Sequence, residues 1–108
     1  TQRIFAYDSE VSVINGSALE REKYLEQVQH VLKVIRKAEL LAVSMGFDTY
    51  KKDLGGLLNT EDYRLLGSWL RQASERLCGG KRFAILEGGY YLPDLGKNVL
   101  AFCEGFEG

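Results

Sequence analysis

The stretch LLAVSMGFDTYKKDLGGL, residues 40–57, leads from a mainly apolar run into a glycine-rich loop that holds an early carboxylate, Asp48. Residues 40–45 are short and bounded by polar turns, as expected for a strand buried on both faces of a parallel sheet. Asp48 has two interpretations. It can close a turn by accepting backbone N–H bonds, or it can belong to a ligand site at the rim of the sheet.

Helical and strand-like segments alternate along the chain. Hydrophobic spacing and turn signals predict one or two short strands within 3–14, followed by a helix of about 20 residues from Ser17, with Glu20 completing a capping box. They then predict a helix from Asn59 or Thr60 that stops at the CGG sequence of residues 78–80, a buried strand over 82–87 and a helix over 92–106. This order indicates an α/β fold of three layers, a parallel sheet flanked by helices. Without a repeat or linker, residues 1–108 are expected to form a single α/β domain.

The composition excludes some classes of function. A formal charge of −1 over 108 residues offers no basic face to nucleic acid. No apolar run approaches the roughly 18 residues of a membrane span and no signal peptide opens the chain, so we expect a cytoplasmic protein without a membrane partner. Cys78 and Cys103 lack metal-ligand spacing and are expected to be reduced. The start at Thr1 suggests a trimmed fragment.

The candidate functional residues follow the two central strands. The carboxyl ends of neighbouring parallel strands meet at the rim where ligands bind, so Asp48 and Tyr90 are expected to emerge together. A phenol with a pKa of about 10 stays protonated at pH 7 and can donate a hydrogen bond to a developing oxyanion. Gly88 and Gly89 let the backbone pass close to a ligand. The alternative for Tyr90 is simple packing at the edge of the sheet.

Other polar residues are weaker candidates. The single histidine, His30, falls in the middle of the first helix and is interpreted as a surface or half-buried structural residue. Asp53 is expected to order its own loop, and Lys51 and Lys52 are expected to be solvated. The GGK sequence at 79–81 lacks the spacing of a phosphate loop.

Together, the segments VSMGFD, DLGGLLNTEDY and AILEGGYYL resemble the C-terminal part of the histone deacetylase and acetylpolyamine amidohydrolase family. The resemblance covers residues 40–103, and the EGGY form is similar to the class II and prokaryotic branch. It implies an arginase–deacetylase fold and zinc-dependent hydrolysis of an N-acetyl amide, either acetyl-lysine or a small acetylated amine. It also implies that Asp48 is a zinc ligand, that Tyr90 is the catalytic oxyanion donor, and that Gly88 and Gly89 line the base of the substrate tunnel.

The same resemblance implies residues that this chain lacks. The other zinc ligands and the paired acid–base histidines of the family lie upstream of its matching segments, and His30 is the single histidine here. A catalytic zinc takes about three protein ligands, so Asp48 alone is not expected to retain it. We therefore expect the chain to be the C-terminal part of a larger deacetylase-like catalytic domain that is inactive alone.

Two alternatives from other classes remain open. One is a non-catalytic α/β binding or regulatory module of the receiver or flavodoxin type, with Asp48 as a phosphorylation or cation site. Asp8 and Glu10 imitate the acidic pair of a receiver, but no lysine follows the strand over 82–87. The other is a fragment that forms homo-oligomers through exposed sheet edges, because unpaired strand edges can pair with another chain.

Overall fold

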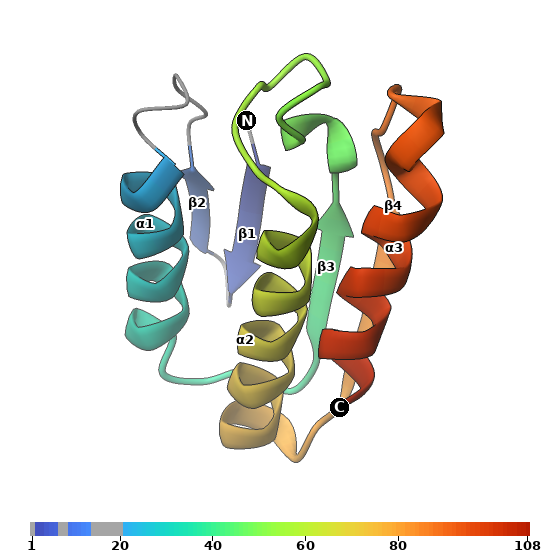
Figure 1. Ribbon diagram of the computed structural model, residues 1–108. Helices are drawn as coiled ribbons and strands as arrows, with labels where there is room; N and C mark the ends of the chain where they lie inside the picture. Colours follow the sequence, from blue (N-terminus) through green and yellow to red (C-terminus); the bar gives the residue numbers. More distant parts are fainter. Residues whose placement is uncertain (1, 7–8, 14–20) are drawn as a thin grey trace.

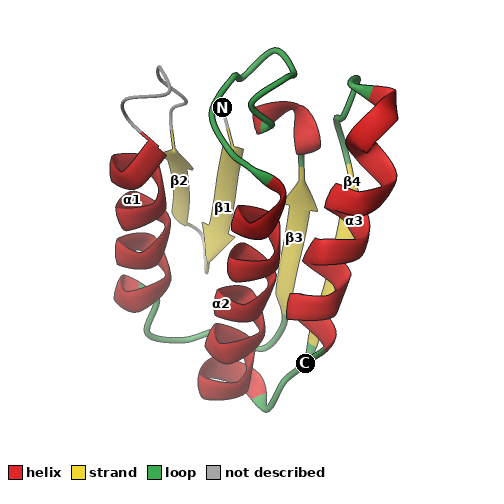
Figure 2. Ribbon diagram, in the orientation of Figure 1, coloured by secondary structure: helices red, strands yellow, loops and turns green. Residues whose placement is uncertain are grey.

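The computed structural model describes residues 2–6, 9–13 and 21–108 (Figures 1 and 2). Its elements follow the predicted order of strands and helices: β1 (Gln2–Ala6), β2 (Ser9–Val13), α1 (Arg21–Val34), β3 (Leu41–Met45), the short 3-10 helix η2 (Phe47–Thr49), α2 (Thr60–Cys78), β4 (Arg82–Leu86) and α3 (Leu92–Glu107). The predicted capping box of Ser17 and Glu20 lies outside the described residues. No helix in the described ranges is long and apolar enough to cross a membrane.

The central strands β3 and β4 are neighbours, as predicted. They pair in parallel, from Leu41 opposite Arg82 to Met45 opposite Leu86. The antiparallel pair of β1 and β2 lies beside β3, and α2 forms the crossover between β3 and β4 (Figure 1). Because the two parallel strands point the same way, the loops after both of them emerge at the same edge of the sheet.

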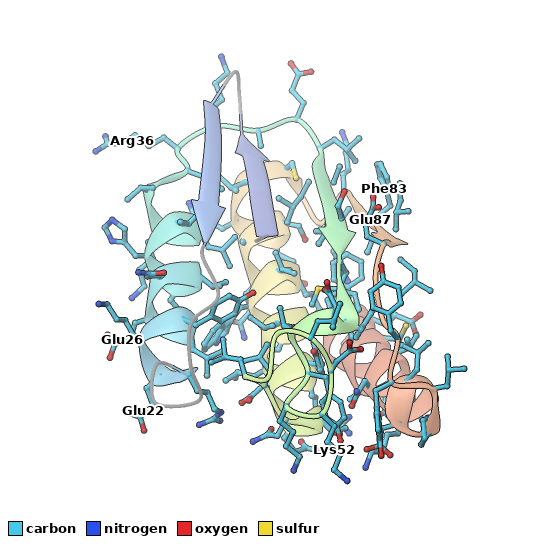
Figure 3. The ribbon with its side chains drawn as sticks, turned by 90° about the horizontal axis from the view of Figure 1, so that it is seen from above. Glu22, Glu26, Arg36, Lys52, Phe83 and Glu87 are labelled. Atoms are coloured by element: carbon cyan, nitrogen blue, oxygen red, sulfur yellow. The ribbon has the colours of Figure 1, made fainter. Side chains whose placement is uncertain are left out.

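The prediction that β3 and β4 are buried on both faces is wrong for the described chain. Figure 1 shows α1, α2 and α3 on one side of the strands, and Figure 3 places Phe83 and Glu87 on the side of β4 away from α3. Ala42 and Ser44 of β3 are exposed, and the side chain of Ile85 in β4 is 53% exposed. Helices thus cover a single face of the strands, so the described residues supply two of the three predicted layers. The α/β class with parallel pairing is confirmed.

The core lies between that covered face and the helices. Buried apolar side chains from the helices and from the loop before α2 fill it: Tyr24, Val28, Val31, Leu32, Leu58, Tyr63, Leu66, Leu70, Ala101 and Phe102. Within α1, His30 is exposed, as interpreted from the sequence. Cys78 and Cys103 are free thiols at partly buried positions, in agreement with the expected reduced state.

Helix α2 begins and ends on local signals. The Asn59 side chain accepts a hydrogen bond from the Asp62 backbone N–H (3.0 Å), and the Asp62 carboxylate accepts one from the Asn59 backbone N–H (2.9 Å). This reciprocal capping satisfies N–H groups that the first turn of a helix leaves unpaired. The helix stops at Gly79, whose φ of 65° is left-handed and favours glycine. Both boundaries match the sequence prediction.

Asp62 also joins α1 to α2. Its side chain is 3% exposed and accepts hydrogen bonds from the Arg21 guanidinium, at 2.7 Å from Nε and 2.5 Å from Nη2. We expect Asp62→Ala to lower the free energy of unfolding by about 2–3 kcal/mol, because the bond from the Asn59 N–H and two charge-assisted bonds from Arg21 are lost together, although the cap made by the Asn59 side chain remains. Urea unfolding followed by circular dichroism measures the change.

The matched control for this substitution is Glu61→Ala at the adjacent, exposed position. Glu61 forms an exposed ion pair with Arg64, and removal of an exposed ion pair is expected to change the stability little. Equal unfolding midpoints for Asp62→Ala and Glu61→Ala would contradict the role assigned to Asp62.

Helices α2 and α3 pack backbone against backbone. A Cβ atom added at Gly105 of α3 would lie 2.0 Å from the carbonyl oxygen of Arg64, and one added at Gly67 of α2 would lie 2.3 Å from the carbonyl oxygen of Phe102. Both glycines are buried. Real Cβ atoms do not approach backbone oxygens so closely, so the helix crossing requires glycine at both positions.

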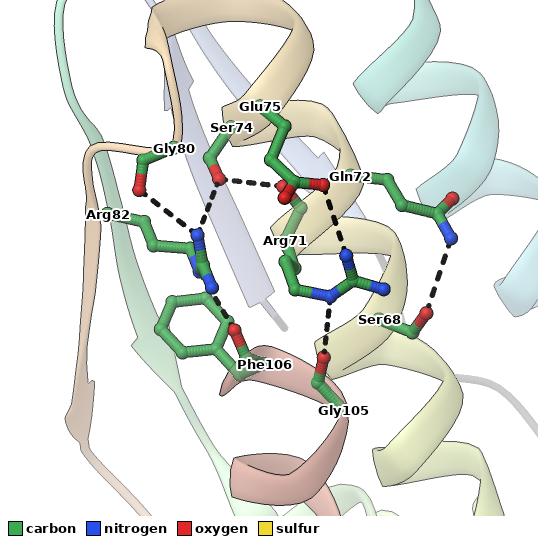
Figure 4. A network of polar contacts seen from close by, with 9 residues as sticks. All are labelled: Ser68, Arg71, Gln72, Ser74, Glu75, Gly80, Arg82, Gly105 and Phe106. Atoms are coloured by element: carbon green, nitrogen blue, oxygen red, sulfur yellow. Dashed lines mark hydrogen bonds and ion pairs between the residues drawn. The ribbon is translucent and has the colours of Figure 1, made fainter. Parts of the chain in front are cut away.

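Two arginines accommodate the carboxyl end of α3 (Figure 4). Arg82, the first residue of β4, donates from Nε to the Phe106 carbonyl oxygen (2.8 Å) and from a terminal nitrogen to the Ser74 hydroxyl (3.3 Å). Arg71 donates to the Gly105 carbonyl oxygen (3.3 Å). The last carbonyl groups of a helix lack partners within it and carry partial negative charge, so these guanidinium groups stabilise the end of α3 and fasten β4 to it.

Candidate active site

Asp48 lies in the middle of η2, directly after β3, and its neighbours hold it in place. Phe47 and Thr49 are 3% and 0% exposed, whereas Asp48 is partly exposed. The Phe47 ring packs on Tyr63 (4.9 Å between centroids) and Phe102 (5.9 Å). Alternate residues of this turn therefore point into the core and leave the carboxylate between them at the rim.

A buried polar contact anchors the same turn to α2. The Thr49 hydroxyl lies 2.7 Å from the Tyr63 hydroxyl, which donates to the Phe47 carbonyl oxygen (3.3 Å). Burial raises the pKa of Tyr63, so its hydroxyl stays protonated over the ordinary pH range. Packing and hydrogen bonds thus fix the turn that carries Asp48, and a binding residue is positioned most precisely on such a rigid element.

The Asp48 carboxylate rests on the backbone of two glycines. A Cβ atom at Gly46 would lie 2.9 Å from Asp48 Oδ1, and a Cβ atom at Gly88 would lie 3.2 Å from Asp48 Cγ. Gly88 is brought there by ladder hydrogen bonds, since the Phe47 N–H donates to the Gly88 carbonyl oxygen (2.7 Å). Among the described residues, no donor hydrogen-bonds to the carboxylate of Asp48; the Gly55 N–H bonds to its main-chain oxygen instead (2.7 Å). The carboxylate is therefore available to a ligand.

Gly89 and Tyr90 continue from Gly88 along the same rim. Gly89 has a φ of 147°, and a Cβ atom there would lie 2.6 Å from Leu95 Cδ1 and 3.2 Å from Phe47 Cβ, so only glycine fits. The Tyr90 side chain is 64% exposed, and its hydroxyl has no hydrogen-bond partner among the described residues. The structure thus brings Asp48, Gly88 and Gly89 together and leaves the Tyr90 ring open at the next loop.

Asp53 connects the two loops of the rim, which the sequence did not reveal. Its Oδ2 atom accepts hydrogen bonds from the backbone N–H groups of Tyr90 (2.7 Å) and Tyr91 (2.9 Å), and its Oδ1 atom accepts one from Leu54 (2.7 Å). The sequence predicted that Asp53 orders its own loop, and the bond from Leu54 does so. The other two bonds join this loop to the loop after β4. Burial alone would raise the pKa of the Asp53 carboxyl, but the bonds from Tyr90, Leu54 and Tyr91 outweigh it and hold the pKa below its ordinary value.

Further contacts join the same loops. The Tyr50 hydroxyl donates to Asp94 Oδ2 at the start of α3 (2.6 Å), which lowers the pKa of Asp94 and raises that of Tyr50. The Tyr91 ring packs near the Tyr50 ring, with 6.1 Å between centroids, and Lys52 Nζ lies 5.7 Å from the Tyr91 ring centroid. Tyr91 therefore serves packing, as the sequence suggested. Lys52 is exposed, as expected, but also makes this cation–π contact.

The fit of a metal to this rim can be judged from the donors present. Asp48 offers a partly exposed carboxylate, an oxygen ligand that lies against the backbone of Gly46 and Gly88. The described ranges contain no group of three His, Cys, Asp or Glu side chains that could hold a metal ion. Asp48 thus fits as one zinc ligand, and the described residues do not complete the site.

Comparisons with known proteins agree with this arrangement. The histone deacetylase domain family matches residues 5–106. Histone deacetylase 10, chloroplastic, of Oryza sativa subsp. japonica is 35% identical over 74 residues, which are 67% of this chain and 17% of the rice protein. Type-2 histone deacetylase 2 of Dictyostelium discoideum is 34% identical over 77 residues, which are 69% of this chain and 4% of that protein.

A solved structure shows the same fold. The crystal structure of acetylpolyamine aminohydrolase from Burkholderia pseudomallei superposes with a TM-score of 0.64 at 24% sequence identity, covering 85% of this chain and 26% of that chain. The predicted partial arginase–deacetylase fold is thereby confirmed. The chain spans about a quarter of the length of that structure and at most 17% of the two deacetylases above. By the family match across nearly its whole length, this chain belongs to the histone deacetylase family.

Proposed function

We propose that this chain is the C-terminal part of the catalytic domain of a zinc-dependent deacetylase, which hydrolyses the N-acetyl amide of acetyl-lysine or of a small acetylated amine. The observation that supports this best is the Asp48 carboxylate, which no described donor engages and which rests on Gly46 and Gly88 at the rim. The activity is proposed for the complete domain, because this chain offers one of the roughly three protein ligands that a catalytic zinc takes.

Each residue of the rim has a role in this proposal. Asp48 would contribute one zinc ligand, and the bound zinc would polarise the amide carbonyl and activate a water molecule. Gly88 and Gly89 would line the base of the substrate tunnel, where the missing side chain of Gly88 keeps the backbone close to the Asp48 carboxylate. The exposed Tyr90 hydroxyl would donate a hydrogen bond to the oxygen that becomes negatively charged in the transition state.

The test uses the full-length protein that contains this chain. We expect it to bind zinc and to deacetylate an acetyl-lysine peptide, and we expect Asp48→Ala to lose both properties. Glu87→Gln is the matched control, because Glu87 is an exposed carboxylate at the same end of β4 whose side chain accepts no hydrogen bond from the described residues. Zinc is quantified by elemental analysis and activity by peptide mass. Unchanged zinc content in Asp48→Ala would refute the assigned ligand.

The same experiment separates the alternative of a non-catalytic α/β binding or regulatory module, which predicts no amide hydrolysis by the full-length protein. Homo-oligomers through exposed sheet edges stay a prediction for the isolated chain. Among the described strands β4 pairs with β3 alone, so its other edge would supply the backbone groups for such pairing, and its Phe83, Ile85 and Leu86 side chains are exposed. Size-exclusion chromatography of the chain measures this directly.

A further inference from the structure

We propose that Asp53 is a positioning residue, which fixes the main chain of Tyr90 relative to Asp48. The inference rests on the proposed function, because Tyr90 matters as a hydrogen-bond donor only if the rim hydrolyses amides. The carrying observation is that a single oxygen, Asp53 Oδ2, accepts both the Tyr90 N–H (2.7 Å) and the Tyr91 N–H (2.9 Å).

The backbone before Tyr90 is shaped for this contact. Gly89 has a φ of 147°, a conformation that L residues with a side chain rarely adopt, and the two amides that follow it converge on one carboxylate oxygen. Hydrogen bonds to an ionised acceptor are roughly twice as strong as neutral ones. The depressed pKa of Asp53 agrees with a carboxylate held ionised by these amides. The loop after β4 is thus pinned at the residue that carries the phenol.

The loop of Asp53 does not need this carboxylate for its own closure. Backbone hydrogen bonds close that loop independently: Lys51 N–H to the Leu58 carbonyl oxygen (2.6 Å), Leu57 N–H to the Thr49 carbonyl oxygen (3.0 Å) and Gly55 N–H to the Asp48 carbonyl oxygen (2.7 Å). The bond from Leu54 is the one local contact of the Asp53 side chain. Its other two bonds span 37 and 38 residues of sequence, so a purely local role does not account for them.

Asp53 also links the two functional residues by a short path. The Gly55 N–H ties the loop to the main chain of Asp48, and the carboxylate of Asp53, two residues earlier, ties it to Tyr90. The Tyr90 side chain itself is 64% exposed, without a hydrogen-bond partner for its hydroxyl among the described residues. Its position is therefore set through its backbone, and Asp53 is the described group that holds that backbone.

We expect Asp53→Ala in the full-length protein to lower kcat by about 10- to 100-fold, because misplacing a catalytic group by about 1 Å can cost 100-fold. Zinc content and KM should stay within about twofold, since Asp48 and the substrate contacts are untouched. The kcat of Asp53→Asn should fall between those of the wild type and Asp53→Ala. The amide oxygen of asparagine can still accept from Tyr90 and Tyr91, but its NH₂ group would face the Leu54 N–H, which is also a donor. Glu87→Gln is the control that removes a rim charge without removing a described hydrogen bond.

A second readout does not depend on activity. Amide hydrogen exchange of the segment 88–92, measured by mass spectrometry on the same proteins, should speed up in Asp53→Ala and stay at the wild-type rate in Glu87→Gln. Unchanged exchange in Asp53→Ala, or faster exchange with an unchanged kcat, would overturn the inference.

The two proposals fail in different ways. If the wild-type protein neither binds zinc nor hydrolyses the peptide, the proposed function fails. Even then, faster exchange in Asp53→Ala would support Asp53 as the residue that holds the loop of Tyr90, whereas unchanged exchange would overturn that as well.

Discussion

Tyr90→Phe is expected to lower kcat for acetyl-lysine peptide hydrolysis by about 100- to 1000-fold in the full-length protein, the usual cost of removing one oxyanion donor. The substitution removes a single oxygen from a side chain that is 64% exposed. That oxygen has no hydrogen-bond partner among the described residues, so the fold loses nothing with it. Zinc content and the unfolding midpoint should therefore be unchanged, and the loss should lie in kcat.

The matched control is Tyr91→Phe, the same chemical change one residue further along the chain. The Tyr91 ring packs near Tyr50 and Lys52, and these contacts survive the loss of the hydroxyl. We expect Tyr91→Phe to keep kcat within about twofold of the wild type, far from the 100-fold loss of an oxyanion donor. Equal losses in both variants, or no loss in Tyr90→Phe, would show that the Tyr90 phenol is not the donor.

Gly105→Ala is expected to lower the free energy of unfolding by about 2–3 kcal/mol, the upper part of the range for overpacked sites. Alanine is favoured over glycine in a helix by about 1 kcal/mol, which works in the opposite direction. The added methyl group would lie 2.0 Å from the Arg64 carbonyl oxygen and 2.8 Å from the Ser68 backbone nitrogen, so α2 and α3 must move apart. The steric cost outweighs the propensity gain because backbone atoms, unlike the end of a long side chain, cannot step aside.

Gly96→Ala tests this reasoning on the same helix. Gly96 is exposed, and a Cβ atom there would have open space around it, so the propensity gain alone remains. We expect this variant to be more stable than the wild type by about 0.5–1 kcal/mol. Urea unfolding of the wild type, Gly105→Ala and Gly96→Ala gives the three free energies of unfolding to compare. A stability change of the same sign in Gly105→Ala and Gly96→Ala would contradict the close crossing of α2 and α3.

The elements of the fold could be predicted because their signals are local. The capping residues Asn59 and Asp62 and the stop at Gly79 lie next to the boundaries they set, and the apolar run at 40–45 is flanked by turns. Burial of β3 and β4 was predicted wrongly because it depends on which elements cover each face, and an apolar run does not tell one covered face from two. The contact of Gly67 with α3 was missed for a similar reason, since helix crossings join residues that are distant in sequence.

The sequence likewise predicted one part of the candidate site and missed another. Asp48 and Tyr90 could be predicted at one edge because parallel pairing brings the ends of neighbouring strands together, and the structure places Gly88, two residues before Tyr90, against the Asp48 carboxylate. Asp53 was assigned to its own loop because an Asp near glycines usually bonds to the backbone just after it. Its bonds to Tyr90 and Tyr91 depend on the exact path of a second loop, for which the sequence carries no local signal.

The exposure of β4 has a consequence for strand slippage. A strand with one buried face keeps its register because a shift by one residue would turn its apolar side chains to solvent. Residues 83–86 of β4 are exposed, so burial does little to fix the register of this strand. Polar contacts hold β4 in register at both ends instead: Arg82 is bound to the end of α3, and the loop after β4 is bound to Asp53. A slip by one residue, about 3.3 Å, would break both attachments together. The number of residues between Arg82 and Tyr90 thus fixes the register of β4, in which Leu86 pairs with Met45. The same register places Gly88 beside Asp48.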